Sequence, residues 1–194
     1  VTLTETDYVD YTTIGEYTVI LTATDPDENF TSVSITVTVQ DTISPETETL
    51  EFTFEVFDDA IDWLTYLTVT DNSLQPVLTT IVADNVDYDV TGEYVVTILL
   101  TDESGNEANY DLTVNIIDVT PPTVNLNSND EVFVEIGTVY VDPGFSVYDN
   151  YDVYNDLVIN VSDNVNFYLE GVYTYTYSVT DVSGNETVKT RTLH

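Results

Sequence analysis

Apolar and polar residues alternate along several short stretches of this chain. Residues 33–39 read V-S-I-T-V-T-V without a break, and residues 112–116 and 173–177 keep the same two-residue period. Successive side chains of a strand point to opposite faces, so each stretch predicts a strand with one buried and one solvated face. No stretch keeps a helical period. Residues 58–64 come nearest, and they fit either one short helical turn or an irregular lead into a strand. The pattern predicts an all-β fold.

The sequence also repeats itself over a long period. Gly15, Gly92 and Gly171 each open a Gly-x-Tyr element, and each element is followed at the same offset by a Thr-Asp turn that ends in Asn. The glycines are 77 and 79 residues apart. A period of this length is too long for a solenoid unit and fits a small β-sandwich domain. We therefore expect tandem immunoglobulin-like β-sandwiches.

The repeat predicts the domain limits. Residues 44–122 and 123–194 each hold a complete immunoglobulin-like domain, whereas residues 1–43 match only the second half of one. That half either belongs to a domain that is cut, or it is completed by another chain that donates strands.

A tyrosine follows each repeat glycine at the same place. Tyr17, Tyr94 and Tyr173 stand two residues after the glycine and ahead of an alternating stretch. In immunoglobulin-like folds a tyrosine here turns its hydroxyl back onto the backbone of the preceding corner. We expect the same structural role for these three. The chain has no cysteine, so no disulfide joins the sheets.

The charge of the chain limits its partners. Asp and Glu number 36 against two basic residues, and the net charge is −34. Such a surface repels nucleic acid and anionic membrane surfaces, so the expected partners are cations or basic surfaces. A high-salt environment or bound metal ions would each relieve the self-repulsion. A plain solubilising surface is the remaining interpretation.

Acidic residues recur at positions that a sandwich brings together. In this topology the incoming linker lies at the same end as the loop after the second strand and the turn after the sixth strand. Carboxylate and amide oxygens are the ligands that Ca²⁺ prefers. The sequence therefore predicts one Ca²⁺ site at the start of each complete domain. The candidate ligands are Asp41, Asp71, Asn72, Asp102 and Asn106 for the first site, and Asp118, Asp149, Asn150, Asp152, Asp181 and Asn185 for the second.

Each of these residues also has an ordinary interpretation. Asp and Asn ahead of Gly commonly form turns, because their side chains bind the local backbone. The stretch 25–36 begins like a calcium loop, but it has Phe30 and Thr36 where an EF-hand needs Gly and Glu, which excludes that motif.

Catalytic chemistry has little support in the sequence. There is no cysteine, and the sole histidine is His194, so no histidine-based triad or zinc site is expected. The chain is predicted not to be an enzyme. Trp63, Tyr151 and Tyr154 are candidates for stacking on a sugar ring, although a tryptophan in the place of Trp63 is more often part of a core.

Several motifs resemble a known family. They are Asp142-Pro143-Gly144-Phe145, the following residues 148–152, the stretch 171–185, and the linkers 41–45 and 118–122, which read D-x-[TS]-x-P or close to it. These motifs are similar to the bacterial immunoglobulin-like repeats of large surface proteins, which are related to hyalin-type repeats. The resemblance implies tandem modules on cell-wall proteins, adhesins or secreted hydrolases, and it implies no catalytic residue.

The leading functional hypothesis is a structural or adhesive stalk or fibre segment of an extracellular or cell-surface protein, stiffened by Ca²⁺ at the domain junctions. One alternative is a carbohydrate- or protein-binding accessory module of a secreted enzyme. Another is a filament subunit that polymerises by donating strands. The expected partners are neighbouring domains of the same or identical chains, together with a surface glycan or protein in the second case.

Overall fold

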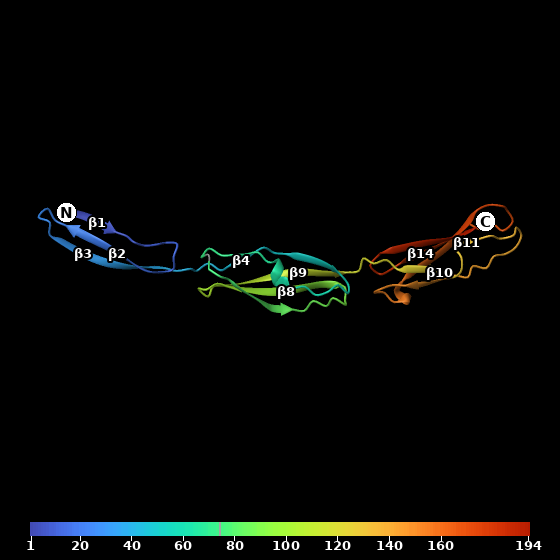
Figure 1. Cartoon of the computed structure of the whole chain (residues 1–194), viewed down its shortest axis with the longest axis horizontal. Helices are drawn as coiled ribbons and strands as arrows, with labels where there is room; N and C mark the ends of the chain where they lie inside the picture. Colours follow the sequence, from blue (N-terminus) through green and yellow to red (C-terminus); the bar gives the residue numbers. More distant parts are fainter. Residues whose placement is uncertain (74) are drawn as a thin grey trace. The chain divides into compact units, whose positions relative to one another are not determined.

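The computed structural model describes residues 1–73 and 75–194, and its regular structure consists of β-strands and two short 3₁₀ turns (Figure 1). None of the helical segments in this described part has the length and apolarity needed to cross a membrane. The predicted all-β, immunoglobulin-like fold is confirmed by the strands and by the paired sheets that they form.

The residues group into two compact units. The first contains Val1–Phe52, Ala60–Val86 and Glu93–Val114, and the second contains Thr53–Asp59, Asp87–Gly92 and Asn115–His194. The predicted domain limits after residues 43 and 122 stay a prediction.

The first unit begins with one antiparallel sheet, here called the N-terminal sheet. Its strands are β1 (Thr2–Thr6), β2 (Gly15–Thr24) and β3 (Phe30–Val39), in the order β1-β2-β3. Figure 1 shows them as a single layer. The alternating stretch 33–39 lies within β3, as predicted. Most side chains of this sheet are exposed, and Val19 is its one buried apolar residue among those described.

The next two sheets form the middle sandwich. Its larger sheet has the order β5-β9-β8-β7, with β5 at Glu51–Glu55, β7 at Leu78–Asp84, β8 at Gly92–Thr101 and β9 at Glu107–Ile117. Its smaller sheet pairs β4 (Glu46–Thr47) with β6 (Val69–Thr70). The alternate side chains of β8 and β9 are fully buried, namely Val96, Ile98, Leu100, Leu112 and Val114. One face of each strand is therefore core, as the alternation requires.

Trp63 belongs to this core. It begins a 3₁₀ turn at Trp63–Tyr66, and the Asp62 carboxylate accepts a hydrogen bond from the Leu64 N–H at 3.1 Å. The indole N–H donates to Asp84 at 2.8 Å, and the ring meets Phe52 edge-on at 5.3 Å between centroids. The structure thus places a helical turn slightly later than residues 58–64, and it removes Trp63 from the candidates for sugar stacking.

The second unit contains the last sandwich. One sheet has the order β11-β15-β14-β13, with β11 at Glu131–Val132, β13 at Val158–Asp163, β14 at Tyr173–Thr180 and β15 at Glu186–Leu193. The facing sheet pairs β10 (Thr123–Leu126) with β12 (Phe145–Tyr148), and a 3₁₀ turn lies at Tyr154–Asp156. The buried core of the last sandwich comprises Val124, Leu157, Tyr177 and Val179.

A charged residue also lies in that core. Arg191 is completely buried, and its guanidinium pairs with the Asp142 carboxylate. It also donates to the carbonyl oxygens of Asn127 at 2.6 Å and Asn129 at 2.9 Å. The Tyr177 hydroxyl donates to the same carboxylate at 2.5 Å. A buried charge is tolerated when it is paired and hydrogen-bonded in this way, and here the pair ties the 142–144 loop to β14 and β15.

The tyrosine corner is present in the first and in the last of the three repeats. The Tyr17 hydroxyl donates to the Thr13 carbonyl at 2.8 Å, and the Tyr173 hydroxyl donates to the Leu169 carbonyl at 3.1 Å. Each bond spans four residues back along the chain, which is the geometry that the sequence predicts.

Candidate metal centres

The first acidic cluster lies where three elements of the first unit end. Asp41 follows β3, Asp71 follows β6, and Asp102 follows β8. One carboxylate oxygen of each lies within 4.8 Å of those of the other two. The structure therefore brings together the linker, the loop and the turn that the sequence predicts to converge.

Two amides hold this cluster. The Asn106 side-chain amide donates to the Asp102 carboxylate at 2.8 Å and to the Asp41 carbonyl at 3.3 Å. The Asn72 amide donates to the Asp41 carboxylate at 3.2 Å. Both asparagines thus present N–H groups to the acids, and their place among the ligands stays a prediction.

The second acidic cluster repeats the arrangement in the second unit. One carboxylate oxygen from each of Asp118, Asp152 and Asp181 lies within 4.8 Å of the others. The Asn185 amide donates to the Asp181 carboxylate at 2.8 Å and to the Asp118 carbonyl at 3.2 Å. These contacts match those of Asn106 in the first cluster, so the repeat preserves the site as well as the fold.

The loop after β12 contributes differently from the corresponding loop of the first cluster. Asp149 accepts hydrogen bonds from the Tyr151 and Asp152 N–H groups at 2.9 and 2.8 Å through one oxygen, so it shapes the loop. Asp152, rather than Asp149, joins the group of three, and it also accepts from the Val182 N–H at 2.8 Å. Asp149 is buried beside this group, with 7% of its surface exposed.

Several oxygens of these clusters are buried without a hydrogen bond. Within the described part of the chain they are Asp41 Oδ2, Asp71 Oδ1, Asp118 Oδ2, Asp149 Oδ2 and Asn150 Oδ1. Only 5% of the surface of Asp118 is exposed to solvent. A buried carboxylate oxygen without a partner is costly, and a bound cation would satisfy it. These oxygen-only donors at short mutual distance fit a divalent cation.

The pKa values of the linker aspartate Asp118 and the turn aspartate Asp102 are shifted in opposite directions. Burial raises the pKa of the Asp118 carboxyl, and the charges of Asp181, Asp149 and Glu55 raise it further. For Asp102, burial also acts to raise the pKa, but hydrogen bonds from the Asn106 side chain and N–H outweigh burial and lower it. The turn aspartate is therefore stabilised as an anion, whereas the linker aspartate is an anion with too few partners.

Glu55 binds the linker beside the second cluster, and the sequence analysis missed this role. Its carboxylate accepts hydrogen bonds from the Val119 N–H at 3.1 Å and from the Thr120 hydroxyl at 2.8 Å. The linker after Asp118 is thereby bound to the end of β5. Glu55 stands in a strand, where a single acidic residue is usually interpreted as facing solvent. The sequence around it therefore gives no sign of this role.

Tyr151 contacts Thr91 and Phe57. Its hydroxyl lies 3.2 Å from both the N–H and the hydroxyl of Thr91, and its ring lies 6.2 Å from that of Phe57. These contacts give Tyr151 a structural role and weaken its case as a sugar-stacking residue. Tyr154 remains exposed.

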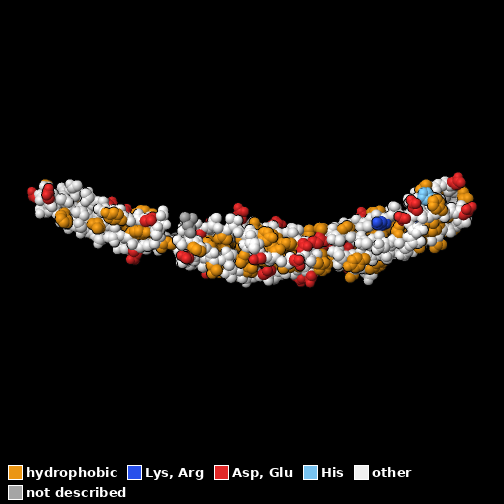
Figure 2. Space-filling model, in the orientation of Figure 1, with side chains coloured by type: hydrophobic (Ala, Val, Ile, Leu, Met, Phe, Trp, Pro, Cys, Tyr) orange, Lys and Arg blue, Asp and Glu red, His pale blue; other side chains and the backbone are white. Residues whose placement is uncertain are grey.

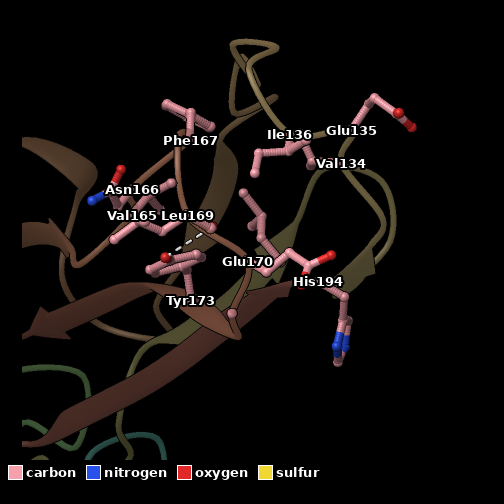
Figure 3. Close-up of a pocket in the computed structure, with 12 residues that line it drawn as sticks. Val134, Glu135, Ile136, Val165, Asn166, Phe167, Leu169, Glu170, Tyr173 and His194 are labelled. Atoms are coloured by element: carbon pink, nitrogen blue, oxygen red, sulfur yellow. Dashed lines mark hydrogen bonds between the residues drawn. The ribbon is translucent and has the colours of Figure 1, made fainter.

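The opposite end of the last sandwich has a hollow of about 270 Å³, lined by both apolar and polar residues. Figure 3 shows Val134, Ile136 and Leu169 around it, with Tyr173 bonded to Leu169 at its base. Strand β14 begins here at Tyr173 and ends beside Asp181, so a full strand length separates this hollow from the second cluster.

Acidic side chains are spread over the visible surface in Figure 2, with Lys or Arg at one place only. Since Arg191 is buried, the described surface has almost no countercharge to offset the two clusters.

Comparison with known proteins agrees with this fold. Residues 124–194 match the family model described as bacterial surface protein, Ig-like domain. The chain is 32% identical over 95% of its length to Hyalin of Strongylocentrotus purpuratus, and 31% identical over 64% of its length to Hyalin of Lytechinus variegatus. It spans 16% and 25% of those two proteins.

A solved structure of protocadherin gammaB7, the EC3-6 cis-dimer, is similar with a TM-score of 0.46 and 14% identity, over 99% of this chain and 67% of that chain. The matches define a class: immunoglobulin-like domains of extracellular or cell-surface proteins.

Proposed function

We propose that this chain is a non-enzymatic stalk segment of a surface protein, and that Ca²⁺ at the two acidic clusters stiffens its domain junctions. The observation that carries the proposal is the repeated group of three carboxylates with buried, unbonded oxygens. A single acidic group would be ordinary on so acidic a chain. Two groups built from the same linker and turn positions and from the corresponding loop, each held by the equivalent asparagine amide, are better explained by a ligand.

The donor set favours Ca²⁺ over other common ions. Every candidate ligand atom is an oxygen, which suits a hard cation, and the chain has neither cysteine nor a histidine near the clusters. Asp41, Asp71 and Asp102 would hold the first ion. Asp118, Asp152 and Asp181 would hold the second, with Asp149 and Asn150 beside them. Irregular clusters of carboxylates and carbonyls suit the flexible shell of Ca²⁺ better than the strict octahedron of Mg²⁺.

The proposed stiffening follows from where the ligands stand in the chain. Asp118 is in the linker, whereas Asp152 and Asp181 are in loops of the last sandwich, so one ion would fasten the linker to that sandwich. Glu55 fastens the same linker to β5 through Val119 and Thr120. The bound ion would therefore reduce the conformational freedom of the linker, on which bending between the domains depends.

Thermal unfolding in chelator, then in millimolar Ca²⁺, tests the proposal, with Mg²⁺ and NaCl at matched ionic strength as controls. An ion that binds only the native state raises the melting temperature by mass action. We expect a rise with Ca²⁺ that exceeds the rise with either control. A rise equal to that of NaCl would mean that the acids are a solvated surface and would overturn the proposal.

Paired variants assign the effect to the cluster. Asp181→Asn removes one ligand of the second site, and it should abolish the Ca²⁺-dependent stabilisation of the last sandwich. Asp130→Asn makes the same charge change at an exposed position of that sandwich, outside the cluster, and should leave the stabilisation intact. Spin labels on either side of the linker would then report whether Ca²⁺ narrows the distance distribution, which is the stiffening itself.

One observation favours a second candidate, a binding module. The hollow near Tyr173 is lined by Val134, Ile136 and Leu169 together with polar residues such as Asn166 and Glu170 (Figure 3). Tyr168, which precedes Leu169 in the chain, is exposed. Against this candidate, Trp63 is buried and Tyr151 is engaged. Saturating glycan or peptide ligands that shift the amide resonances of the hollow in chelator, without Ca²⁺, would support a binding module in place of the stalk.

A further inference from the structure

The end of the middle sandwich next to the second linker is built from two segments that touch each other. The Phe57 N–H donates to the Tyr88 carbonyl at 2.7 Å, and this bond joins the end of β5 to the segment that leads into β8. We call these two segments, Thr53–Asp59 and Asp87–Gly92, the socket. They come from the middle sandwich, yet they fall into the same compact unit as the last sandwich. The socket therefore contacts the last sandwich directly.

One residue of the socket has a strained backbone. Phe57 lies in the left-handed region with φ of 70°, which a bulky side chain adopts only where its surroundings enforce it. The Asp58 N–H donates to the Glu55 carbonyl at 3.1 Å and closes the turn that holds Phe57. Phe57 is nevertheless 52% exposed, so the strain does not serve to bury it in the core. The turn presents the ring at the surface, which indicates a contact with another part of the chain.

Tyr151, in the loop after β12, makes that contact. Its ring lies 6.2 Å from the ring of Phe57, and its hydroxyl lies 3.2 Å from both the N–H and the hydroxyl of Thr91. A phenol can accept from the N–H while it donates to the hydroxyl oxygen, so both of its hydrogen-bonding functions are satisfied here. An aromatic ring with a polar tip suits a contact that is apolar along its side and polar at its end.

The socket also binds the linker. The Glu55 carboxylate accepts hydrogen bonds from the Val119 N–H at 3.1 Å and from the Thr120 hydroxyl at 2.8 Å. The socket is therefore fastened at two places, to the linker through Glu55 and to the loop through Tyr151. Neither fastening uses a carboxylate of the three that form the second cluster, and neither needs a cation.

The repeat shows that Tyr151 is not needed to build its own loop. Asp149 accepts a hydrogen bond from the Tyr151 N–H at 2.9 Å, and Asp71 of the middle sandwich accepts one from the Ser73 N–H at 2.9 Å. Ser73 therefore occupies the repeat position of Tyr151. The same turn forms around a serine, so the aromatic side chain in the last sandwich has a role other than shaping the loop.

We propose that Tyr151 and the socket form a latch that holds the end of the middle sandwich against the last sandwich in the absence of any cation. The socket is an interaction surface, and the partner that it fits is a loop with a tyrosine at this repeat position. A loop with a serine there makes the turn but lacks the ring that meets Phe57. The inference goes beyond the proposed function, because the latch stiffens this junction before an ion binds.

Distance measurements between two spin labels test the latch. The chain has no cysteine, so Thr80→Cys in β7 and Ser162→Cys in β13 give one label at an exposed position of each sandwich. In chelator, Tyr151→Ser should widen the distance distribution about twofold or more, because domains without a sufficient interface move relative to each other. Tyr154→Ser removes an exposed tyrosine from the 3₁₀ turn that follows and should leave the width unchanged.

Two outcomes of this comparison would overturn the proposal. Equal widths for the wild-type protein and Tyr151→Ser would mean that the contact holds nothing. Equal widening by Tyr151→Ser and Tyr154→Ser would mean that the loss of any tyrosine near this loop has the same effect, and that the contact with the socket is not its cause.

A variant on the other side of the contact keeps the test valid if Tyr151→Ser perturbs its own loop. Phe57→Gly removes the ring and also relieves the positive φ. It should widen the distribution as Tyr151→Ser does, whereas the melting temperature of the middle sandwich should not fall. A lower melting temperature with an unchanged width would mean that Phe57 only stabilises its own sandwich. A double variant that widens the distribution by the sum of the two single effects would also contradict the latch, because both changes remove one contact.

The latch and the proposed function can fail separately, since the measurements above are made in chelator. Ca²⁺ added to Tyr151→Ser should narrow the widened distribution, because the ion would still fasten the linker to the last sandwich. If the distribution stays wide, stiffening by Ca²⁺ fails at this junction and the latch stands. If the wild-type protein in chelator is as wide as Tyr151→Ser, the latch fails and stiffening by Ca²⁺ is unaffected.

Discussion

Buried carboxylates of two kinds occur in this protein. Asp142 has partners for its charge, in Arg191 and Tyr177, and it belongs to the core. Asp118 has a raised pKa and a buried oxygen without a hydrogen bond. The first kind stabilises the fold as it stands, whereas the second is satisfied only when a cation binds. Substitution of each should therefore have opposite consequences in chelator.

Asp118→Asn should raise the melting temperature of the last sandwich in chelator by about 2–5 °C. The substitution removes a charge that repels Asp181 and Asp149, and the remaining side-chain oxygen can still accept from the Thr120 N–H. In millimolar Ca²⁺ the order should reverse, with the wild-type protein melting higher. Calorimetry in both buffers measures this, and a variant that is less stable in both would contradict the assignment.

Asp142→Asn should destabilise the last sandwich by about 3 kcal/mol at neutral pH, because Arg191 is left as a buried charge without its counterion. Burial acts to raise the pKa of Asp142, but hydrogen bonds from Tyr177 and Arg191 outweigh it and lower the pKa. A lowered native pKa stabilises the fold above the unfolded pKa of about 4 and loses this effect as pH falls through the native pKa.

The difference between wild type and this variant should consequently shrink as the pH is lowered below about 4. Hydrogen exchange of the β14 and β15 amides at neutral and acid pH reports it locally. A difference that stays constant with pH would show that the Asn costs stability through packing rather than charge.

At the scale of single elements, the Asp-x-x-x-Asn turn is the part that all three repeats share. Gly105 and Gly184 occupy its fourth position with φ of 86° and 94°, and Glu28 occupies it in the first repeat with φ of 70°. The aspartate and the asparagine fix the turn, and the glycine only makes it easier to adopt.

Gly184→Ala should destabilise the last sandwich by about 1 kcal/mol, because alanine has to adopt a left-handed backbone conformation. A Cβ there meets nothing within 4 Å, so the effect is one of backbone conformation alone. Chemical denaturation followed by near-ultraviolet circular dichroism measures the change. Ser183→Ala, one residue earlier, serves as the control and should be nearly neutral. A larger loss for Ser183→Ala would contradict this explanation.

These elements also show what the sequence could predict. The alternation at 33–39 predicts β3, and the fixed spacing from Gly to Asp and Asn predicts where the acids converge. The choice of Asp152 over Asp149 could not be predicted, because both stand in one loop and only the turn geometry separates them. Glu55 looks like a solvated strand residue. Arg191 stands at a core position of the repeat, and only its burial with Asp142 shows why.

At the scale of the whole molecule, the net charge of −34 dominates. Like charges destabilise a folded state through mutual repulsion, and dissolved salt screens that repulsion. In chelator, raising NaCl from about 10 mM to about 1 M, which shortens the Debye length from about 30 to 3 Å, should raise the melting temperature by several degrees. KCl should act equally. A melting temperature that does not change with salt would mean that the charges are too far apart for their repulsion to affect stability.

The burial of Arg191 has a consequence for the survival of the protein outside a cell. Proteases of the trypsin class cleave after Lys or Arg, and this chain offers them only Lys189 and Arg191. Both lie within β15 and are paired with β14, and the arginine side chain is inaccessible. Such a protease can therefore cut the chain only after the last sandwich opens, so digestion at these sites follows the opening equilibrium of that sandwich.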